Sequence, residues 1–482
     1  MAKMIYGVED KPKFKVLFIC ALQQLLAIIA GTITVPMLIG LPNMMPAAIL
    51  GCGLATMTYL LITKRKSPVI LSSNFAFIGA LITAKSYGFL GIMLGGIFTG
   101  SVYIVLSIIV KIIGTKWIDK VFPPIIIGPV VSLIGLTLAG SAMTDLIKAN
   151  GYVIGDGASA SNPYNLVALL CGLIAFIVVI ICSIQNHKKF LNLTPFLVAI
   201  IVGYAVAAIF SIFGYTLDVA YLKIIDFSPI TDNFKEIGVT SFLDYPRFVL
   251  LNGIQEVADN NVKLTGIGVL EIALAFIPVA LVSFSEHIAD HKNLSSIIGK
   301  DLLTDDPGLH RTLLADGCGS IIGTAMGVCP SATYSQSVGC VAITKNASVW
   351  TMFLTSIMCI ALCFFTPFIK VLQTIPSCVM GGICMALYGF IAVSGLRMLS
   401  GINIGEGKNL YTLSAILVAG IGGLSIQIPY EMEAFNETNI YVPTKWISIS
   451  SIAVALLIGI LTYSICTFIE KRNLPEEPND IM

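Results

Sequence analysis

Three acidic side chains stand inside long apolar runs of this 482-residue chain, where ionisable groups are rare. Glu286 and Asp290 lie in the stretch LVSFSEHIADHK, and Asp316 lies in LLADGCGS. Because Glu286 and Asp290 are four residues apart, a helix presents both carboxylates on one face. Two neighbouring carboxylates in a low dielectric are expected to share a proton, which a proton-coupled carrier needs. For Asp316, a structural polar contact and a role in coupling both stay open.

Two histidines next to these acids offer a rival chemistry. His287 and His291 are also four residues apart, and two such histidines can hold a metal ion. Their face lies about 100° round the helix from the two acids, so the four side chains do not converge on one ion. No metal site is therefore predicted. We expect His291, which is next to Lys292, to lie at the cytoplasmic surface. For Asp290, the alternative to a role in proton coupling is a solvated position at the same helix end.

Two apolar segments, 68–84 and 329–347, begin with poorly helical stretches. SPVILSSNFAFIGALITA and CPSATYSQSVGCVAITK are rich in Pro, Ser and Thr and should become helical only near Gly79 and Gly339, after a short strand in each. Unwound backbone at membrane depth is tolerated only where it lines a cavity or is buried in protein. The sequence therefore predicts a binding site here, with two half-helix amino termini aimed at the ligand.

The second of these segments carries Gln336, followed by Ser337 and Gly339. A side-chain amide both donates and accepts, which suits a planar heterocycle with alternating N–H and C=O groups beside a carboxylate. Phe75, in the matching stretch of the first segment, is a candidate stacking face for such a ring, and core packing is its alternative.

The composition assigns these segments to a membrane protein. Charged residues make up 11% and hydrophobic residues 56% of the chain, and the mean hydropathy is +0.91. A soluble domain carries about 25% charged residues. The net charge of +1 gives nucleic acid nothing to bind. The 12 cysteines scatter through apolar runs, so neither a disulfide framework nor a zinc ribbon is indicated, and no catalytic motif or cofactor motif marks an enzyme.

Apolar runs long enough to cross a bilayer recur fourteen times. With the amino terminus inside, 20 of the 28 Lys and Arg residues fall on inner segments, which predicts a multi-pass protein with both termini in the cytoplasm. The predicted spans are 14–40, 46–63, 68–84, 89–113, 122–143, 164–185, 190–214, 267–291, 309–327, 329–347, 349–368, 373–397, 409–428 and 444–469.

The longest polar interruption, 215–266, leaves seven spans on either side. An odd number of spans per repeat turns the second copy upside down, so the expected fold is an all-α membrane protein of two inverted seven-span repeats. Pro123 and Gly128 open the fifth span with the same spacing as Pro376 and Gly381 in the twelfth, which agrees with a repeat.

Several stretches together resemble one known family. GLHRTLLADGCGSIIGTAMGVCPSATYSQSVGCVAITK, with Gln336, Gly339, Thr344 and Lys345, resembles the signature Q/E/P-N-x-G-x4-T-R/K/G of the nucleobase-ascorbate transporters. SEHIADHKNLSSIIGKDLLTDDPGLHR looks like the eighth span and following loop of that family. SSNFAFIGALITA and GTKWIDKVFPPIIIGPVVSLIGLTLAG look like the bacterial uracil permeases within it.

The resemblance implies a fold and an activity. It implies a core domain of 1–120 and 267–369 that moves against a gate domain of 121–266 and 370–482, and a homodimer joined through the gate. It also implies import of a free nucleobase together with a proton, sodium being the less expected ion, across the plasma (inner) membrane. An anion exchanger or channel of the same inverted-repeat architecture is the alternative function.

The family's binding residues map onto this chain position by position. The resemblance implies that Glu286 and Gln336 hold the base and that Phe75 is the aromatic of the third span. The backbone around Asn74, Ala76, Tyr334, Ser335 and Ser337 completes the implied pocket, Glu286 and Asp290 couple the proton, and Gln24, Asp316, Gly339 and Thr344 support the site.

Two positions depart from the family pattern, and two more depart from the uracil permeases within it. Ser337 replaces the Asn of the signature, and Gln24 stands where the first span usually carries His. Uracil permeases usually have Glu in the signature and His four residues after the eighth-span Glu, whereas this chain has Gln336 and Asp290, which look like the xanthine and urate carriers. The overall resemblance therefore favours uracil as substrate, and the site residues favour an oxopurine.

Overall fold

The computed structural model of the chain describes residues 4–115, 117–118, 123–148, 164–185, 191, 194–435 and 440–473. Five of the basic residues behind the predicted orientation, Lys3, Lys116, Lys120, Lys188 and Lys189, lie outside these ranges, as does the start of the predicted span 190–214. The chain divides into one unit of Met1–Gly114 with Leu138–Tyr388 and a second of Thr115–Thr137 with Gly389–Met482.

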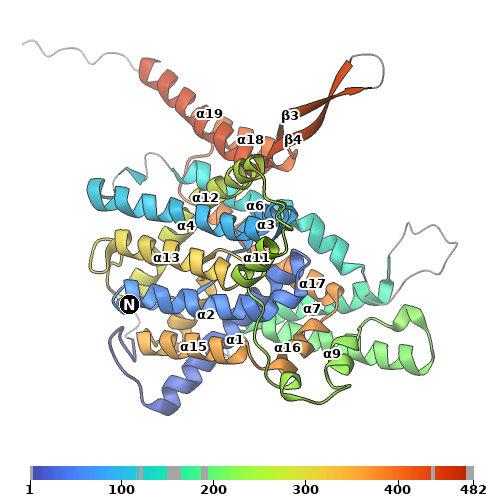
Figure 1. Cartoon of the computed structure of the whole chain (residues 1–482). Helices are drawn as coiled ribbons and strands as arrows, with labels where there is room; N and C mark the ends of the chain where they lie inside the picture. The colour runs from blue at the N-terminus through green and yellow to red at the C-terminus, as the bar shows by residue number, and fades with distance from the viewer. Residues whose placement is uncertain are drawn as a thin grey trace, which may run out of the picture. The chain divides into compact units, whose positions relative to one another are not determined.

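Helices dominate the structure (Figure 1). Those wholly within the first unit are α1 (Phe14–Leu38), α2 (Met45–Ile62), α3 (Ile78–Ser86), α4 (Gly88–Ile113), α7 (Leu166–Ile184), α9 (Pro195–Thr216), α10 (Ser228–Asn233), α11 (Val249–Ala258), α12 (Gly266–Ile298), α13 (Gly308–Ala325), α14 (Ser335–Thr344), α15 (Val349–Leu362) and α16 (Thr366–Gln373). The second unit holds α18 (Gly407–Ile421), the antiparallel strands β3 (Ile426–Phe435) and β4 (Ile440–Ile449), and α19 (Ser451–Asn473). Both units share α6 (Pro124–Leu146) and α17 (Ser377–Arg397).

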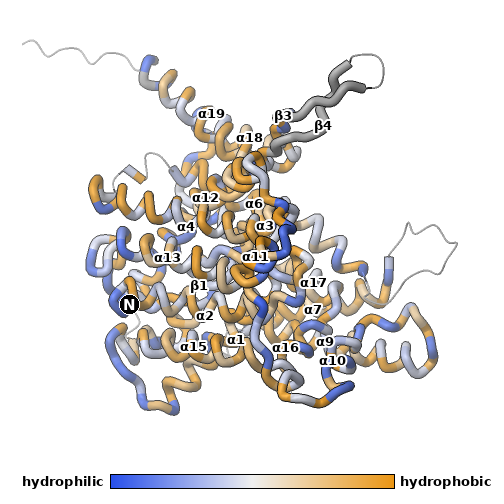
Figure 2. The backbone as a smooth tube through the Cα atoms, in the orientation of Figure 1, coloured by the Kyte–Doolittle hydropathy of each residue, from blue (hydrophilic) through white to orange (hydrophobic). Residues whose placement is uncertain are grey.

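Nine helices within the described ranges are long and apolar enough to cross a membrane. They confirm the predicted all-α, multi-pass membrane protein, and Figure 2 shows that the residues along the helices are largely hydrophobic. The remaining predicted spans contain shorter or more polar helices, namely α3, α13, α14, α15 and α18.

Several predicted boundaries were wrong. Helix α12 does not end near 291: it continues to Ile298, and Gly299 terminates it in the left-handed conformation at φ 72°. Helix α14 begins at Ser335, four residues before Gly339. The predicted span 373–397 is interrupted before α17, where Pro376 leaves the backbone non-helical, and the last span begins only at Ser451, because residues 440–449 form a strand.

Glycines bring α13 close to two neighbouring helices of the first unit. A methyl group at Gly51 of α2 would lie 2.6 Å from the carbonyl oxygen of Gly323 on α13. A methyl group at Gly100 of α4 would lie 2.6 Å from the carbonyl oxygen of Gly317, also on α13. Small residues allow such backbone approach between membrane helices. Asp316 therefore lies in a tightly packed layer between α2 and α4.

Each broken span contains a three-residue strand, as predicted. Strand β1 (Leu71–Ser73) pairs antiparallel with β2 (Ser331–Thr333), with Ser73 opposite Ser331 and Leu71 opposite Thr333. Backbone bonds from Asn74 N to Pro330 O (3.2 Å) and from Tyr334 N to Ile70 O (3.2 Å) extend the pairing at both ends. Because the strands are antiparallel, α3 and α14 leave the pair in opposite directions, and both begin beside it.

Candidate functional site

The amino termini of the two half-helices are built by Asn74 and Tyr334. The Asn74 side chain caps the turn Phe75–Phe77 before α3 by accepting a hydrogen bond from Ala76 N at 2.9 Å. Tyr334 is the extended residue before α14 and accepts backbone bonds from Ser337 N (2.9 Å) and Val338 N (3.3 Å). Unpaired N–H groups and the helix dipole make both ends suited to a polar ligand.

Glu286 of α12 lies beside the first of these half-helices. Its carboxylate interacts with the Asn74 side-chain amide, which donates to Ser283 Oγ at 2.6 Å. Tyr103 of α4 donates to the same Ser283 hydroxyl at 3.1 Å. Glu286 and Asn74 are both partly exposed, so a carboxylate and an amide that are fixed by their neighbours remain open to a ligand.

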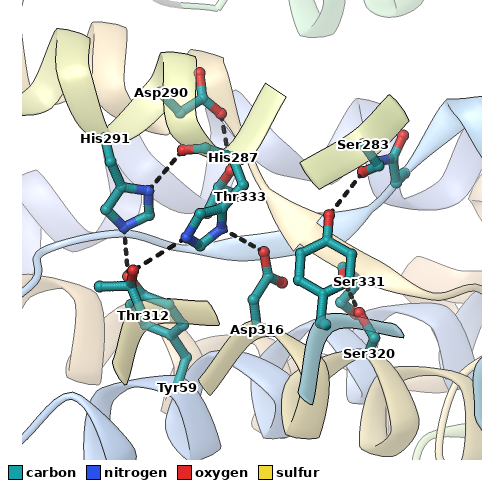
Figure 3. A network of polar contacts seen from close by, with 12 residues as sticks. Tyr59, Ser283, His287, Asp290, His291, Thr312, Asp316, Ser320, Ser331 and Thr333 are labelled. Atoms are coloured by element: carbon teal, nitrogen blue, oxygen red, sulfur yellow. Dashed lines mark hydrogen bonds and ion pairs between the residues drawn. The ribbon is translucent and has the colours of Figure 1, made fainter. Parts of the chain in front are cut away.

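Asp290 fixes the second half-helix. Its two carboxylate oxygens accept hydrogen bonds from Ser335 Oγ at 2.6 Å and Thr333 Oγ1 at 2.9 Å, and Figure 3 shows the carboxylate above the strand residue. The side chain is 7% exposed. A solvated helix-end position for Asp290 is therefore wrong, because α12 continues past it. Glu286 therefore contacts the first broken span, and Asp290 contacts the second.

Aromatic residues form the apolar part of the site. Phe75 is 6% and Tyr334 is 7% exposed, and both approach Gly31 of α1. A methyl group at Gly31 would collide with the Tyr334 hydroxyl and would lie 3.5 Å from Phe75 Cζ. Ala76 is buried next to Phe75. Sequence reasoning missed Gly31, although a glycine inside a helix commonly marks a close approach of other groups.

Gln336 and Gly339 line a cavity of about 150 Å³. The other lining residues come from α1 (Leu26 and Ala27), from the beginning of α9 (Thr194–Leu197) and from α14 (Cys340 and Ile343). The Gln336 side chain is partly exposed, and none of the hydrogen bonds within the described ranges uses its amide, so that amide is available to a ligand.

The two departures from the family pattern lie against each other. Gln24 donates from Nε2 to the carbonyl oxygen of Ser337 at 3.3 Å, and both side chains are almost fully buried. Within the described residues, neither Gln24 Oε1 nor Ser337 Oγ has a hydrogen-bond partner. Thr344 lies at the far end of α14, about 14 Å along the helix from Ser335, where its hydroxyl donates to Cys340 O at 2.7 Å.

A buried polar network lies behind the site (Figure 3). His287 Nδ1 is 2.6 Å from Asp316 Oδ2, with both side chains fully buried. His291 contacts the His287 carbonyl through Nδ1 (2.8 Å) and the Tyr59 hydroxyl through Nε2 (2.8 Å). The predicted surface position of His291 is therefore wrong. The spacing of the histidines was visible in the sequence, but their partners on α2 and α13 were not.

This arrangement favours a binding site over a metal centre. Within the described ranges, no group of three or more His, Cys, Asp or Glu side chains could hold a metal ion. The groups that can reach a ligand are a carboxylate, side-chain amides, hydroxyls and two helix amino termini, with Phe75 and Tyr334 as apolar neighbours. Such a set can orient a small planar polar molecule by several directional hydrogen bonds.

In a comparison with protein families, residues 15–428 match the Permease family. The chain is 35% identical over 431 residues to the uracil permease of Bacillus caldolyticus, covering 89% of this chain and 90% of that protein. It is 31% identical over 433 residues to the uracil permease of Escherichia coli K12, with 89% and 90% covered.

Solved structures of low sequence identity share the fold. The transmembrane domain of the cyanobacterial bicarbonate transporter BicA matches with a TM-score of 0.57 at 14% identity, covering 86% of this chain and 99% of that one. The murine anion transporter Slc26a9 in its inward-facing state matches with a TM-score of 0.61 at 10% identity, covering 97% and 70%. These matches concern the fold alone.

Proposed function

The chain belongs to the nucleobase-ascorbate transporter family, and from this premise we propose that it is a secondary transporter that imports a free nucleobase, uracil or an oxopurine such as xanthine. The observation that carries the proposal is the partly exposed Glu286 carboxylate, held by Asn74 where a span is broken. A carboxylate accepts from ring N–H groups, and the free amide of Gln336 pairs with a neighbouring N–H and C=O.

The proposed site uses the remaining residues in supporting roles. Phe75 supplies a face for the ring, and the backbone of Asn74, Ala76, Tyr334, Ser335 and Ser337 supplies donors and acceptors at the two half-helix ends. Gln24, Asp316, Gly339 and Thr344 support the site from behind. Glu286 takes up the coupling proton when the nucleobase binds, and Asp290 assists it from the next helical turn. The coupling ion is the proton rather than sodium, and no cofactor takes part.

The proposed architecture has fourteen spans in two inverted repeats. The antiparallel pairing of β1 with β2, one from each half of the chain, supports such a repeat. In the proposed cycle the core domain, 1–120 and 267–369, moves against the gate domain, 121–266 and 370–482, and exposes the site alternately to either side. The protein is proposed to be a homodimer in the inner membrane with both termini in the cytoplasm.

Uptake by a bacterial strain that lacks nucleobase carriers tests this function. The strain expresses the full chain and receives labelled uracil or labelled xanthine, each with and without a protonophore. Accumulation that the protonophore abolishes supports proton coupling, and the accumulated base identifies the substrate. If neither base enters cells that hold the inserted protein, the substrate assignment is refuted.

An anion path is the second candidate, since similar folds occur in a bicarbonate transporter and an anion transporter. Glu286 opposes it, because an ionised carboxylate at the half-helix ends repels an anion. The variant Glu286→Gln separates the two functions. A coupled nucleobase carrier loses accumulation in this variant, whereas an anion path keeps or gains flux.

A further inference from the structure

The His287–Asp316 pair is a fully buried acid–base contact that does not border the proposed ligand site directly. His287 Nδ1 lies 2.6 Å from Asp316 Oδ2, and His287 Nε2 lies 3.1 Å from Thr312 Oγ1. Thr312 Oγ1 is also 3.0 Å from the carbonyl oxygen of Leu309. The other Asp316 oxygen, Oδ1, makes no hydrogen bond to any described residue. The Thr312 hydroxyl can therefore donate either to His287 Nε2 or to Leu309 O.

The neighbouring His291 has only one tautomer that fits its contacts. Its Nδ1 faces the carbonyl oxygen of His287 at 2.8 Å, and a carbonyl oxygen only accepts. Nδ1 must therefore carry the hydrogen, and the neutral ring accepts from the Tyr59 hydroxyl through Nε2 at 2.8 Å. Tyr59 in turn accepts from Ser67 at 2.8 Å. His291 is thus held neutral while it stacks on His287 with ring centroids 4.1 Å apart.

The His287–Asp316 pair, in contrast, fits two proton counts without any movement of heavy atoms. In the first, His287 is neutral and donates from Nδ1 to the Asp316 carboxylate, while Thr312 donates to Nε2, and the pair carries a charge of −1. In the second, Nε2 also carries a hydrogen and donates to Thr312 Oγ1, while the Thr312 hydroxyl turns to donate to Leu309 O. The pair is then neutral, and the contacts of His287 with Asp316 and with Thr312 are both kept.

We propose that the His287–Asp316 pair, with Thr312 as its switch, is a second proton-binding site that is loaded and unloaded during each transport cycle. This inference rests on the proposed nucleobase transport. One proton from water adds to the Nε2 lone pair of His287, which takes the pair from −1 to zero. The same proton returns to water when the site opens on the other side, so proton and charge balance over the cycle.

The groups packed around the pair suit a change of charge by one unit. On α12 the pair has Asp290 and the neutral His291 as neighbours, and on α4 the ring of Tyr103 stands edge-on to His287 at 6.1 Å. Tyr59 of α2 is a further titratable neighbour.

Asp290, which lies three residues after His287 on the same helix, interacts electrostatically with both Asp316 and Glu286 and therefore links the charge of the pair to Glu286. Proton loading of the pair removes a repulsion from Asp290, so that the two carboxylates proposed to couple the proton, Glu286 and Asp290, release it more readily. The pair thereby couples proton uptake to binding at the ligand site.

Replacing Thr312 by Val, with Thr312→Ser as the matched control, tests the switch. Valine keeps the shape but cannot turn a hydroxyl, whereas serine keeps the hydroxyl. The full chain is reconstituted in liposomes, and two rates are compared: exchange of labelled uracil for unlabelled uracil, and accumulation of labelled uracil driven by a pH gradient. Xanthine replaces uracil where the uptake assay identifies xanthine as substrate.

The expected result separates the two rates. Thr312→Val exchanges with the half-saturation of the wild type but loses the part of gradient-driven accumulation that the second proton supplies, which is about tenfold per pH unit for each coupled proton. Thr312→Ser behaves as the wild type. Full accumulation by Thr312→Val overturns the inference, and so does equal loss of exchange in both variants, which shows a purely structural role.

The wild type serves as the check on the underlying function. A wild type that exchanges nucleobase but never accumulates it refutes proton coupling, and with it the proton site. A wild type that transports neither base refutes the proposed function itself, whatever the variants do.

Discussion

Replacing Asp290 by Asn should weaken nucleobase binding through the second half-helix. The carboxylate accepts from both Ser335 and Thr333, and an amide is neutral and has only one accepting oxygen, so these two bonds to a charged acceptor cannot both be kept. A hydrogen bond to a charged group contributes about 1.5–3 kcal/mol. Because Ser335 is exposed and Thr333 half-buried, the lower part of that range applies. We expect a loss of about 1.5–2 kcal/mol, or about 10- to 30-fold in affinity.

A double-mutant cycle with Thr333→Val tests the reason for this loss. If both changes remove the same hydrogen bond, the double variant binds little worse than the weaker single variant, and the coupling energy is about 1 kcal/mol or more. Thr99→Val is the matched control, because the Thr99 hydroxyl is buried in α4 and donates only to Gly95 O of its own helix at 3.0 Å. It should couple to Asp290→Asn by no more than about 0.5 kcal/mol.

The assay is equilibrium binding of labelled uracil and labelled xanthine to the purified protein in detergent. Thermal unfolding of each variant in the same detergent shows whether it is folded. Fully additive effects of Asp290→Asn and Thr333→Val would refute the reasoning, since Asp290 would then act independently of the strand that it contacts. An Asp290→Asn variant with wild-type affinity for the transported base would refute it as well.

Three further outcomes follow from the described contacts. Glu286→Gln should abolish accumulation of nucleobase in cells while leaving the amount of inserted protein unchanged, and retained accumulation would remove Glu286 from coupling. Ser337→Ala should change the midpoint of thermal unfolding little, because the Ser337 hydroxyl has no hydrogen-bond partner among the described residues and removal of an unsatisfied buried group is nearly neutral. A large drop in this midpoint would show that the hydroxyl does make a hydrogen bond. Gly51→Ala should destabilise the protein by about 1–3 kcal/mol, because the new methyl group would lie 2.6 Å from Gly323 O and 2.8 Å from Gly327 Cα. Gly140→Ala is the control and should not destabilise the protein, because there is open space around its added methyl group. Equal midpoints of the two variants in thermal unfolding would contradict the close packing of α2 on α13.

The broken spans could be predicted because their signal is local. Pro, Ser and Thr in SPVILSSN and CPSATYSQ disfavour helix, and the segments occupy matching places in the two halves of the chain. The structure adds the register of β1 with β2, which no local signal contains, since the strands are separated by more than 250 residues. The start of α14 was predicted too late, because Gly339 suggested a helix start while Tyr334 and Ser335 already form one.

Side-chain partners were the part of the site that sequence could not predict. The i, i+4 spacing placed Glu286 and Asp290 on one face, and the structure agrees, since each contacts a broken span. The same spacing gave His287 and His291 a face of their own, but nothing in the sequence pairs His287 with Asp316 or His291 with Tyr59. Lys292 suggested a helix end at that point, and this local cue was overruled by the continuation of α12 to Ile298.

The three acids differ in their contacts. Among the described residues, two hydroxyls of the second broken span donate to Asp290, and His287 contacts Asp316, whereas Glu286 interacts with no donor other than the Asn74 amide and remains partly exposed. A ligand that brings its own N–H donors therefore gains most at Glu286, because the other two carboxylates already have donors. The same division explains why Gln336 can replace a signature glutamate at this site. If Glu286 binds the ligand as proposed, a second carboxylate on α14 would add repulsion, while an amide adds a donor and an acceptor without charge.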